Sequence, residues 1–108
     1  SIAQQIYDHN QLMKERAENI RKSFVTVLYE IEDNTLYVSY EKTDIVARPL
    51  HAIVTLASGQ RLVDADPTVD GTELYYWFEL ENRDEMFPEA FTLELFEGTM
   101  KVYSMRVG

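Results

Sequence analysis

Four acidic side chains between residues 64 and 73 form the densest group of potential metal ligands in the sequence: Asp64, Asp66, Asp70 and Glu73. Calcium takes about six to eight oxygen ligands, which clustered carboxylates supply. The spacing differs from the helix-flanked calcium loop, since Pro67 and its neighbours interrupt the alternation. A solvated turn, opened by Asp66-Pro67 and closed by Asp70-Gly71, is the favoured interpretation. Calcium binding is the weaker alternative, and we expect no other metal and no cofactor.

Nucleophilic catalysis would require a hydroxyl beside a histidine that a carboxylate orients. The chain holds two histidines, His9 and His51, and neither lies in a Gly-x-Ser-x-Gly motif or a glycine-rich phosphate loop. Paired carboxylates for glycoside cleavage depend on a separation in space that the sequence does not give. We therefore predict that the protein is not an enzyme.

Three aromatic residues are the strongest candidates for a binding face: Tyr37, Tyr75 and Trp77. Leu74, Tyr76, Phe78 and Leu80 alternate with Tyr75 and Trp77, so these two should point away from a core that the first set fills. We expect the same outward placement for Tyr37 and Tyr103. Such a row could stack on sugar rings, or it could lie beneath another element. The second interpretation is favoured.

The covering element would be an N-terminal helix. Residues 2–22 contain no Gly or Pro and are rich in helix formers. Apolar residues and His9 recur at helical spacing, which predicts one narrow stripe. Its members Ile2, Ile6, Met13 and Ile20 would contact either the sheet or a partner.

From Ser23 the periodicity changes to two, which predicts strands. The expected strands are 24–32, 35–41, 50–56, 60–64, 72–81, 91–96 and 100–107, with a tight hairpin turn at Asp33-Asn34. Seven antiparallel strands of this length are typical of an immunoglobulin-like β-sandwich. We expect one mainly β domain over 1–108, with a helix over 1–22 and the sandwich over 23–108.

The net charge of −9 in 108 residues disfavours nucleic acid as a partner. The absence of cysteine removes disulfides and thiol chemistry. No apolar run approaches the roughly 20 residues of a membrane span, so we expect no insertion by this segment. Because the chain begins with Ser1, we expect it to be part of a longer protein that could carry a signal or anchor.

Three stretches resemble a known group of domains: residues 33–40 (DNTLYVSY), 70–78 (DGTELYYWF) and 87–95 (FPEAFTLEL). Through them residues 24–107 look like the immunoglobulin-like domains in the extracytoplasmic parts of Gram-positive anti-sigma-factor and related membrane-anchored regulatory proteins. The resemblance implies a bacterial, extracytoplasmic or cell-surface accessory module with no catalytic residues.

The leading functional expectation is therefore a non-catalytic interaction module that binds a protein partner or a second copy of itself. A carbohydrate-binding module that uses Tyr37, Tyr75 and Trp77 is one alternative. A structural subunit of a phage or pilus-type assembly, in which exposed strand edges pair with neighbours, is another.

Overall fold

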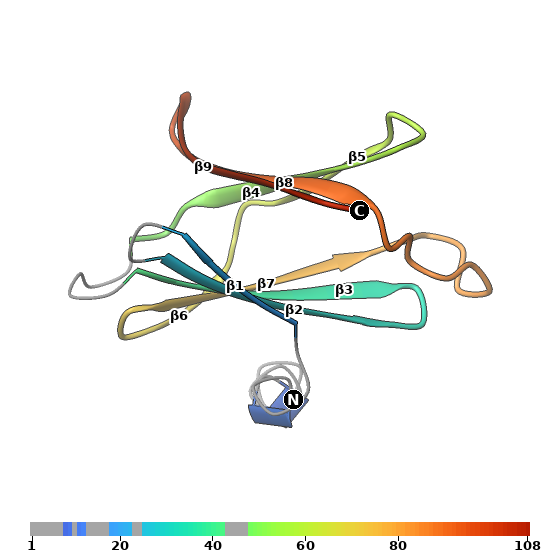
Figure 1. Ribbon diagram of the computed structural model, residues 1–108, viewed down its shortest axis with the longest axis horizontal. Coiled ribbons are helices and arrows are strands. Elements are labelled where there is room, and N and C mark those ends of the chain that lie inside the picture. Colours follow the sequence, from blue (N-terminus) through green and yellow to red (C-terminus); the bar gives the residue numbers. More distant parts are fainter. Residues whose placement is uncertain (1–7, 10, 13–17, 23–24, 43–47) are drawn as a thin grey trace.

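The computed structural model describes residues 8–9, 11–12, 18–22, 25–42 and 48–108. These residues form two antiparallel β-sheets stacked face to face (Figure 1). The five-stranded sheet has the order β1-β2-β3-β7-β6: β1 Glu18–Lys22, β2 Val25–Glu32, β3 Thr35–Lys42, β7 Glu73–Glu79 and β6 Thr68–Asp70. The four-stranded sheet has the order β5-β4-β8-β9: β5 Arg61–Asp64, β4 His51–Leu56, β8 Phe91–Glu97 and β9 Met100–Val107. The predicted β-sandwich is confirmed.

Apolar side chains, contributed by alternate residues of the strands, fill the space between the sheets. Leu36 and Val38 of β3 face Val54 of β4 and Leu93 of β8 in one apolar cluster, and all four are fully buried. The Tyr76 hydroxyl donates a hydrogen bond of 2.8 Å to the Leu50 carbonyl, which joins the layers through a buried polar contact. The predicted inward row of β7 is therefore confirmed, since Leu74, Tyr76 and Phe78 are buried.

The hairpin between β2 and β3 turns where the sequence predicts it. Asp33 has a φ of 54°, the left-handed conformation that Asp tolerates in tight turns. The turn also binds the segment that follows β7 through backbone hydrogen bonds. Phe87 N–H donates to the Asp33 carbonyl, and Leu80 N–H donates to the Asn34 carbonyl. The Asn34 side chain donates to the Leu80 carbonyl at 2.8 Å.

Two elements differ from the prediction. Residues 18–22, expected in the helix, form β1, whose residues Glu18 to Lys22 pair with Tyr29 to Val25. This pairing satisfies backbone groups along one side of β2, which outweighs the weak helical preference of a few residues. Residues 68–70, expected in a turn, form β6 against β7.

Over residues 1–17 the predicted N-terminal helix stays a prediction, because most of these residues lie outside the described ranges. Asp8, His9, Gln11 and Leu12 have helical backbone, and they lie on the side of the five-stranded sheet that faces away from the other sheet (Figure 1). The rest of the predicted helix up to residue 17 lies outside the described residues. No helix within the described ranges has the length and apolar character needed to cross a bilayer.

Candidate functional site on the outer face of the five-stranded sheet

The outer face is the side of the five-stranded sheet turned away from the four-stranded sheet. In β2, β3 and β7 every second residue points into the core, and the residues in between point to this outer face. The register places Tyr37 opposite Trp77, Ser39 opposite Tyr75 and Glu41 opposite Glu73. The predicted aromatic residues Tyr37, Tyr75 and Trp77 are thus close together on one face.

The aromatic half of this face is covered by the chain itself. The His9 ring stacks on the Tyr37 ring with a centroid distance of 3.5 Å and an interplanar angle of 24°. Tyr37 in turn contacts Trp77, with centroids 5.6 Å apart. Tyr75 is 4% exposed. Trp77 Nε1 is buried and has no hydrogen-bond partner.

Two glutamates of β2 flank the histidine. His9 Nε2 lies 3.8 Å from Glu30 Oε2, and His9 Nδ1 lies 3.5 Å from Glu32 Oε2. The side chains of His9 and Glu30 are 14% and 15% exposed, whereas that of Glu32 is 52% exposed. Burial raises the pKa of Tyr37 above its usual value, and the negative charges of Glu32, Glu79 and Glu30 add to this effect.

The other half of the outer face is polar and hollowed. The depression has a volume of about 320 Å³ and is lined by Thr26, Leu28, Ser39, Glu41 and Glu73. Both acids accept hydrogen bonds from hydroxyls: Glu41 from Thr72 at 3.0 Å, and Glu73 from Tyr75 and from Ser39. These bonds fix the carboxylates in place along the strand pair.

The four acids predicted as weak calcium ligands do not converge. Asp64 accepts bonds from the backbone N–H groups of Trp77 and Asp66, each at 3.0 Å. Asp70 is paired with Glu73 across the β6–β7 hairpin. Among the described residues, a different trio brings three candidate ligand atoms within 4.8 Å of one another: His9, Glu30 and Glu32.

The second histidine lies far from this group in the fold. His51 is half-buried in β4, which belongs to the other sheet, and stacks on Phe96 with a centroid distance of 5.1 Å. Within the described residues, neither His9 nor His51 forms a hydrogen bond with a serine or threonine hydroxyl. The geometry offers no nucleophile activated by a histidine in this part of the chain.

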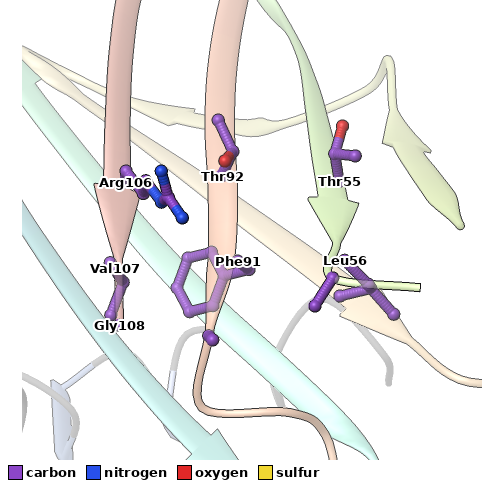
Figure 2. Close-up of a pocket in the computed structure, with 9 residues that line it drawn as sticks. Thr55, Leu56, Phe91, Thr92, Arg106, Val107 and Gly108 are labelled. Atoms are coloured by element: carbon purple, nitrogen blue, oxygen red, sulfur yellow. The ribbon is translucent and has the colours of Figure 1, made fainter. Parts of the chain in front are cut away.

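A second depression, of about 130 Å³, lies at one end of the four-stranded sheet (Figure 2). Thr55 and Leu56 of β4, Phe91 and Thr92 of β8, and Arg106 of β9 line it together with the C-terminal residues. Its volume is well below the roughly 300–1,000 Å³ of ordinary small-molecule pockets.

Three of the predicted contact residues, Ile2, Ile6 and Met13, lie outside the described residues. Ile20 is in β1, where its backbone is paired with Val27, so the predicted helical stripe does not extend to it. Leu12, which the prediction did not select, is 53% exposed.

Tyr103, expected to point outward, is buried in the core and packs edge-on against Tyr40. A register irregularity between Leu95 and Phe96 shifts the pairing of β8 with β9, and the simple alternation of inward and outward residues fails there. The exposed residue at this point is Val102.

The observed class is an antiparallel β-sandwich in which His9 of the N-terminal segment covers part of the outer face. Comparison with known proteins adds no identity, because no family model, no curated protein and no solved structure matches the chain.

Proposed function

We propose that the protein is a non-catalytic interaction module, an immunoglobulin-like β-sandwich that binds a protein partner through its N-terminal segment and the outer face beneath it. One observation carries the proposal. Leu12 is 53% exposed on the same short helical segment whose His9 stacks on Tyr37. The His9 ring of this segment packs on the sheet, while Leu12 presents an apolar side chain to solvent, which suits a contact surface.

The covered rings favour this function over carbohydrate binding. A sugar would need open aromatic faces, but His9 lies on Tyr37 and Tyr75 is 4% exposed. Binding of a glycan on this face would first require removal of the His9 ring.

The strand edges favour a discrete partner over assembly by strand addition. The edge strands β5 and β6 are four and three residues long. The edge strand β9 has a register irregularity after its first two residues and carries the exposed Lys101 and Arg106. Short, irregular and charged edges oppose pairing with further strands.

The resemblance of residues 24–107 to extracytoplasmic domains of membrane-anchored bacterial regulators supports an accessory role outside the membrane. The sequence of the full gene tests this location. An extracytoplasmic domain of an anchored protein should be encoded together with a signal peptide or a membrane anchor.

The first partner to test is a second copy of the chain. Sedimentation velocity over a wide concentration range should show reversible dimers, strengthened by salt because each copy carries a net charge of −9. Leu12→Glu should abolish the dimer, and the matched control Gln11→Glu, which adds the same charge one residue away on an exposed position, should weaken it only slightly.

A monomer at every concentration, combined with a change in Trp77 fluorescence on addition of a glycan, would replace the proposal with the carbohydrate alternative. Dimers that persist in Leu12→Glu would show that the N-terminal segment is not the contact surface.

A further inference from the structure

One histidine and two glutamates converge where the N-terminal segment meets the outer face. The ligand atoms of His9, Glu30 and Glu32, one from each residue, all lie within 4.8 Å of one another. Glu30 and Glu32 reach the same side because they are two residues apart on β2. We propose that this cluster binds a divalent transition-metal ion, with zinc as the reference ion.

The distances suit an ion better than direct hydrogen bonds. Protein N–H···O bonds are about 2.7–3.2 Å long, whereas the two His9 nitrogens lie 3.8 and 3.5 Å from the carboxylate oxygens. Two ligands of a tetrahedral zinc ion, each bonded at about 2.0–2.2 Å, are about 3.4 Å apart. The gap of 3.8 Å between His9 Nε2 and Glu30 Oε2 is therefore close to the spacing that a shared ion imposes.

A buried nitrogen identifies the ligand atom of the histidine. His9 Nε2 is shielded from solvent and has no hydrogen-bond partner. Leaving such a group buried and unsatisfied costs about 1–3 kcal/mol. The lone pair of a neutral imidazole nitrogen is a common metal ligand. The stacked Tyr37 ring holds the imidazole plane in the orientation that directs Nε2 toward Glu30.

The two carboxylates have different roles. Glu30 is largely buried and faces Nε2, so it is the fixed second ligand. Glu32 is half-exposed and lies nearer Nδ1, so it must move to become the third ligand. Solvent on its side completes the coordination, as in zinc sites with three protein ligands. Imidazole with carboxylates suits zinc, nickel and copper, whereas calcium and magnesium prefer oxygen ligands alone.

Trp77 provides the readout on the complete, untagged chain. It is the only tryptophan, and it contacts Tyr37, on which His9 stacks. Open-shell Ni²⁺ bound at His9 should quench its fluorescence with a one-to-one saturating curve. Zn²⁺ has a filled d shell and does not quench, so adding it should displace Ni²⁺ and restore the emission. Isothermal titration with Zn²⁺ gives the affinity independently.

Substitutions then locate the site. His9→Gln and Glu30→Gln each remove a ligand and should weaken binding by more than the roughly 10- to 100-fold that the loss of an outer-shell partner costs. Glu32→Gln should weaken it by about tenfold. His51→Gln, which removes the other histidine, should leave the affinity unchanged. Circular dichroism checks that each variant is folded.

Two results would overturn the proposal. One is the absence of saturable quenching or heat below about 1 mM metal. The other is binding that survives in both His9→Gln and Glu30→Gln. Neither result depends on self-association, so this test and that of the interaction module can fail separately.

Discussion

Replacing Asp64 with alanine tests whether the acidic segment 64–73 is structural. Its carboxylate accepts the backbone N–H of Trp77 through Oδ2 and that of Asp66 through Oδ1, each at 3.0 Å. Trp77 N lies beyond the point at which β6 stops pairing with β7, since that pairing reaches only Tyr75. Asp64 therefore takes the place of a missing neighbouring strand.

The magnitude follows from the burial of these bonds. The bond to Trp77 is partly buried and has a charged acceptor, a type that contributes about 1.5–3 kcal/mol. The bond to Asp66 is exposed and adds little. We expect Asp64→Ala to lower the free energy of unfolding by about 2–3 kcal/mol, and each kcal/mol lowers Tm by about 4–8 °C in a domain of this size.

Urea denaturation followed by Trp77 emission and by circular dichroism measures this loss. Asp64→Asn keeps an acceptor without the charge, so its loss should be roughly half as large. Asp66→Ala is the matched control, because only the backbone of Asp66 takes part in the bond, and its effect should stay within about 0.5 kcal/mol.

Equal stabilities of Asp64→Ala and Asp66→Ala would refute this reasoning. Stabilisation of the wild-type chain by calcium, lost in both variants, would instead revive the calcium interpretation of the segment.

Three further measurements test the core, the hairpin and the tyrosines. Leu93→Ala should cost about 2–5 kcal/mol in urea denaturation because Leu93 is fully buried, whereas Val63→Ala, at a position 62% exposed, should cost less than about 0.5 kcal/mol. Asn34→Ala removes the buried bond to Leu80 O and should cost about 1–3 kcal/mol. Asn82→Ala removes only an exposed bond from the Asp84 N–H and should cost less than about 0.5 kcal/mol. Burial raises the pKa of four tyrosines: Tyr37, Tyr40, Tyr76 and Tyr103. Their stabilising contribution is fully present below about pH 10 and is lost as the pH rises above it, because the unfolded chain ionises first. Tyrosinate absorbance and urea midpoints should show late ionisation coupled to unfolding, and ionisation at the usual pH in the folded chain would contradict this.

Alternation along long strands made most of the sandwich predictable. In β7 the order Leu74, Tyr75, Tyr76, Trp77 alternates between the core and the outer face as expected, because a strand with one face in the core has its register fixed by its apolar residues. The tight turn at Asp33 was predictable for a different, local reason: few residue types tolerate a positive φ, and Asp is one of them.

Strands β1 and β6 were not predicted, because their stability comes from pairing with a neighbouring strand. β1 and β6 contain five and three residues, too few for a clear period. Each forms by pairing with the longer strand that follows it in the sequence. The buried position of Tyr103 was missed because the irregularity at Leu95 depends on the pairing of β8 with β9 and has no local sequence signal.

The candidate site was predictable only in pieces. His9 is the polar member of the predicted apolar stripe, and Glu30 and Glu32 are two residues apart on one strand, so they share a face. Their meeting depends on where the N-terminal segment crosses the sheet, a contact between residues more than one element apart. In the acidic segment 64–73, Asp64 instead accepts a hydrogen bond from the backbone N–H of Trp77.

The proposed ion and the proposed partner act on the same short segment, and their coupling follows from where each one binds. An ion on His9 Nε2 and Glu30 would hold the segment on the sheet, while Leu12 would stay exposed to a partner. A ligand shifts an equilibrium only through different affinities for its two states. If the partner binds Leu12 while His9 stays packed on the sheet, zinc should strengthen dimerisation of the wild-type chain. Zinc should then have no effect on dimerisation of His9→Gln. If the partner instead needs the rings of Tyr37 and Trp77, zinc should weaken it, because the His9 ring would be held over them. Sedimentation with and without zinc separates the two surfaces.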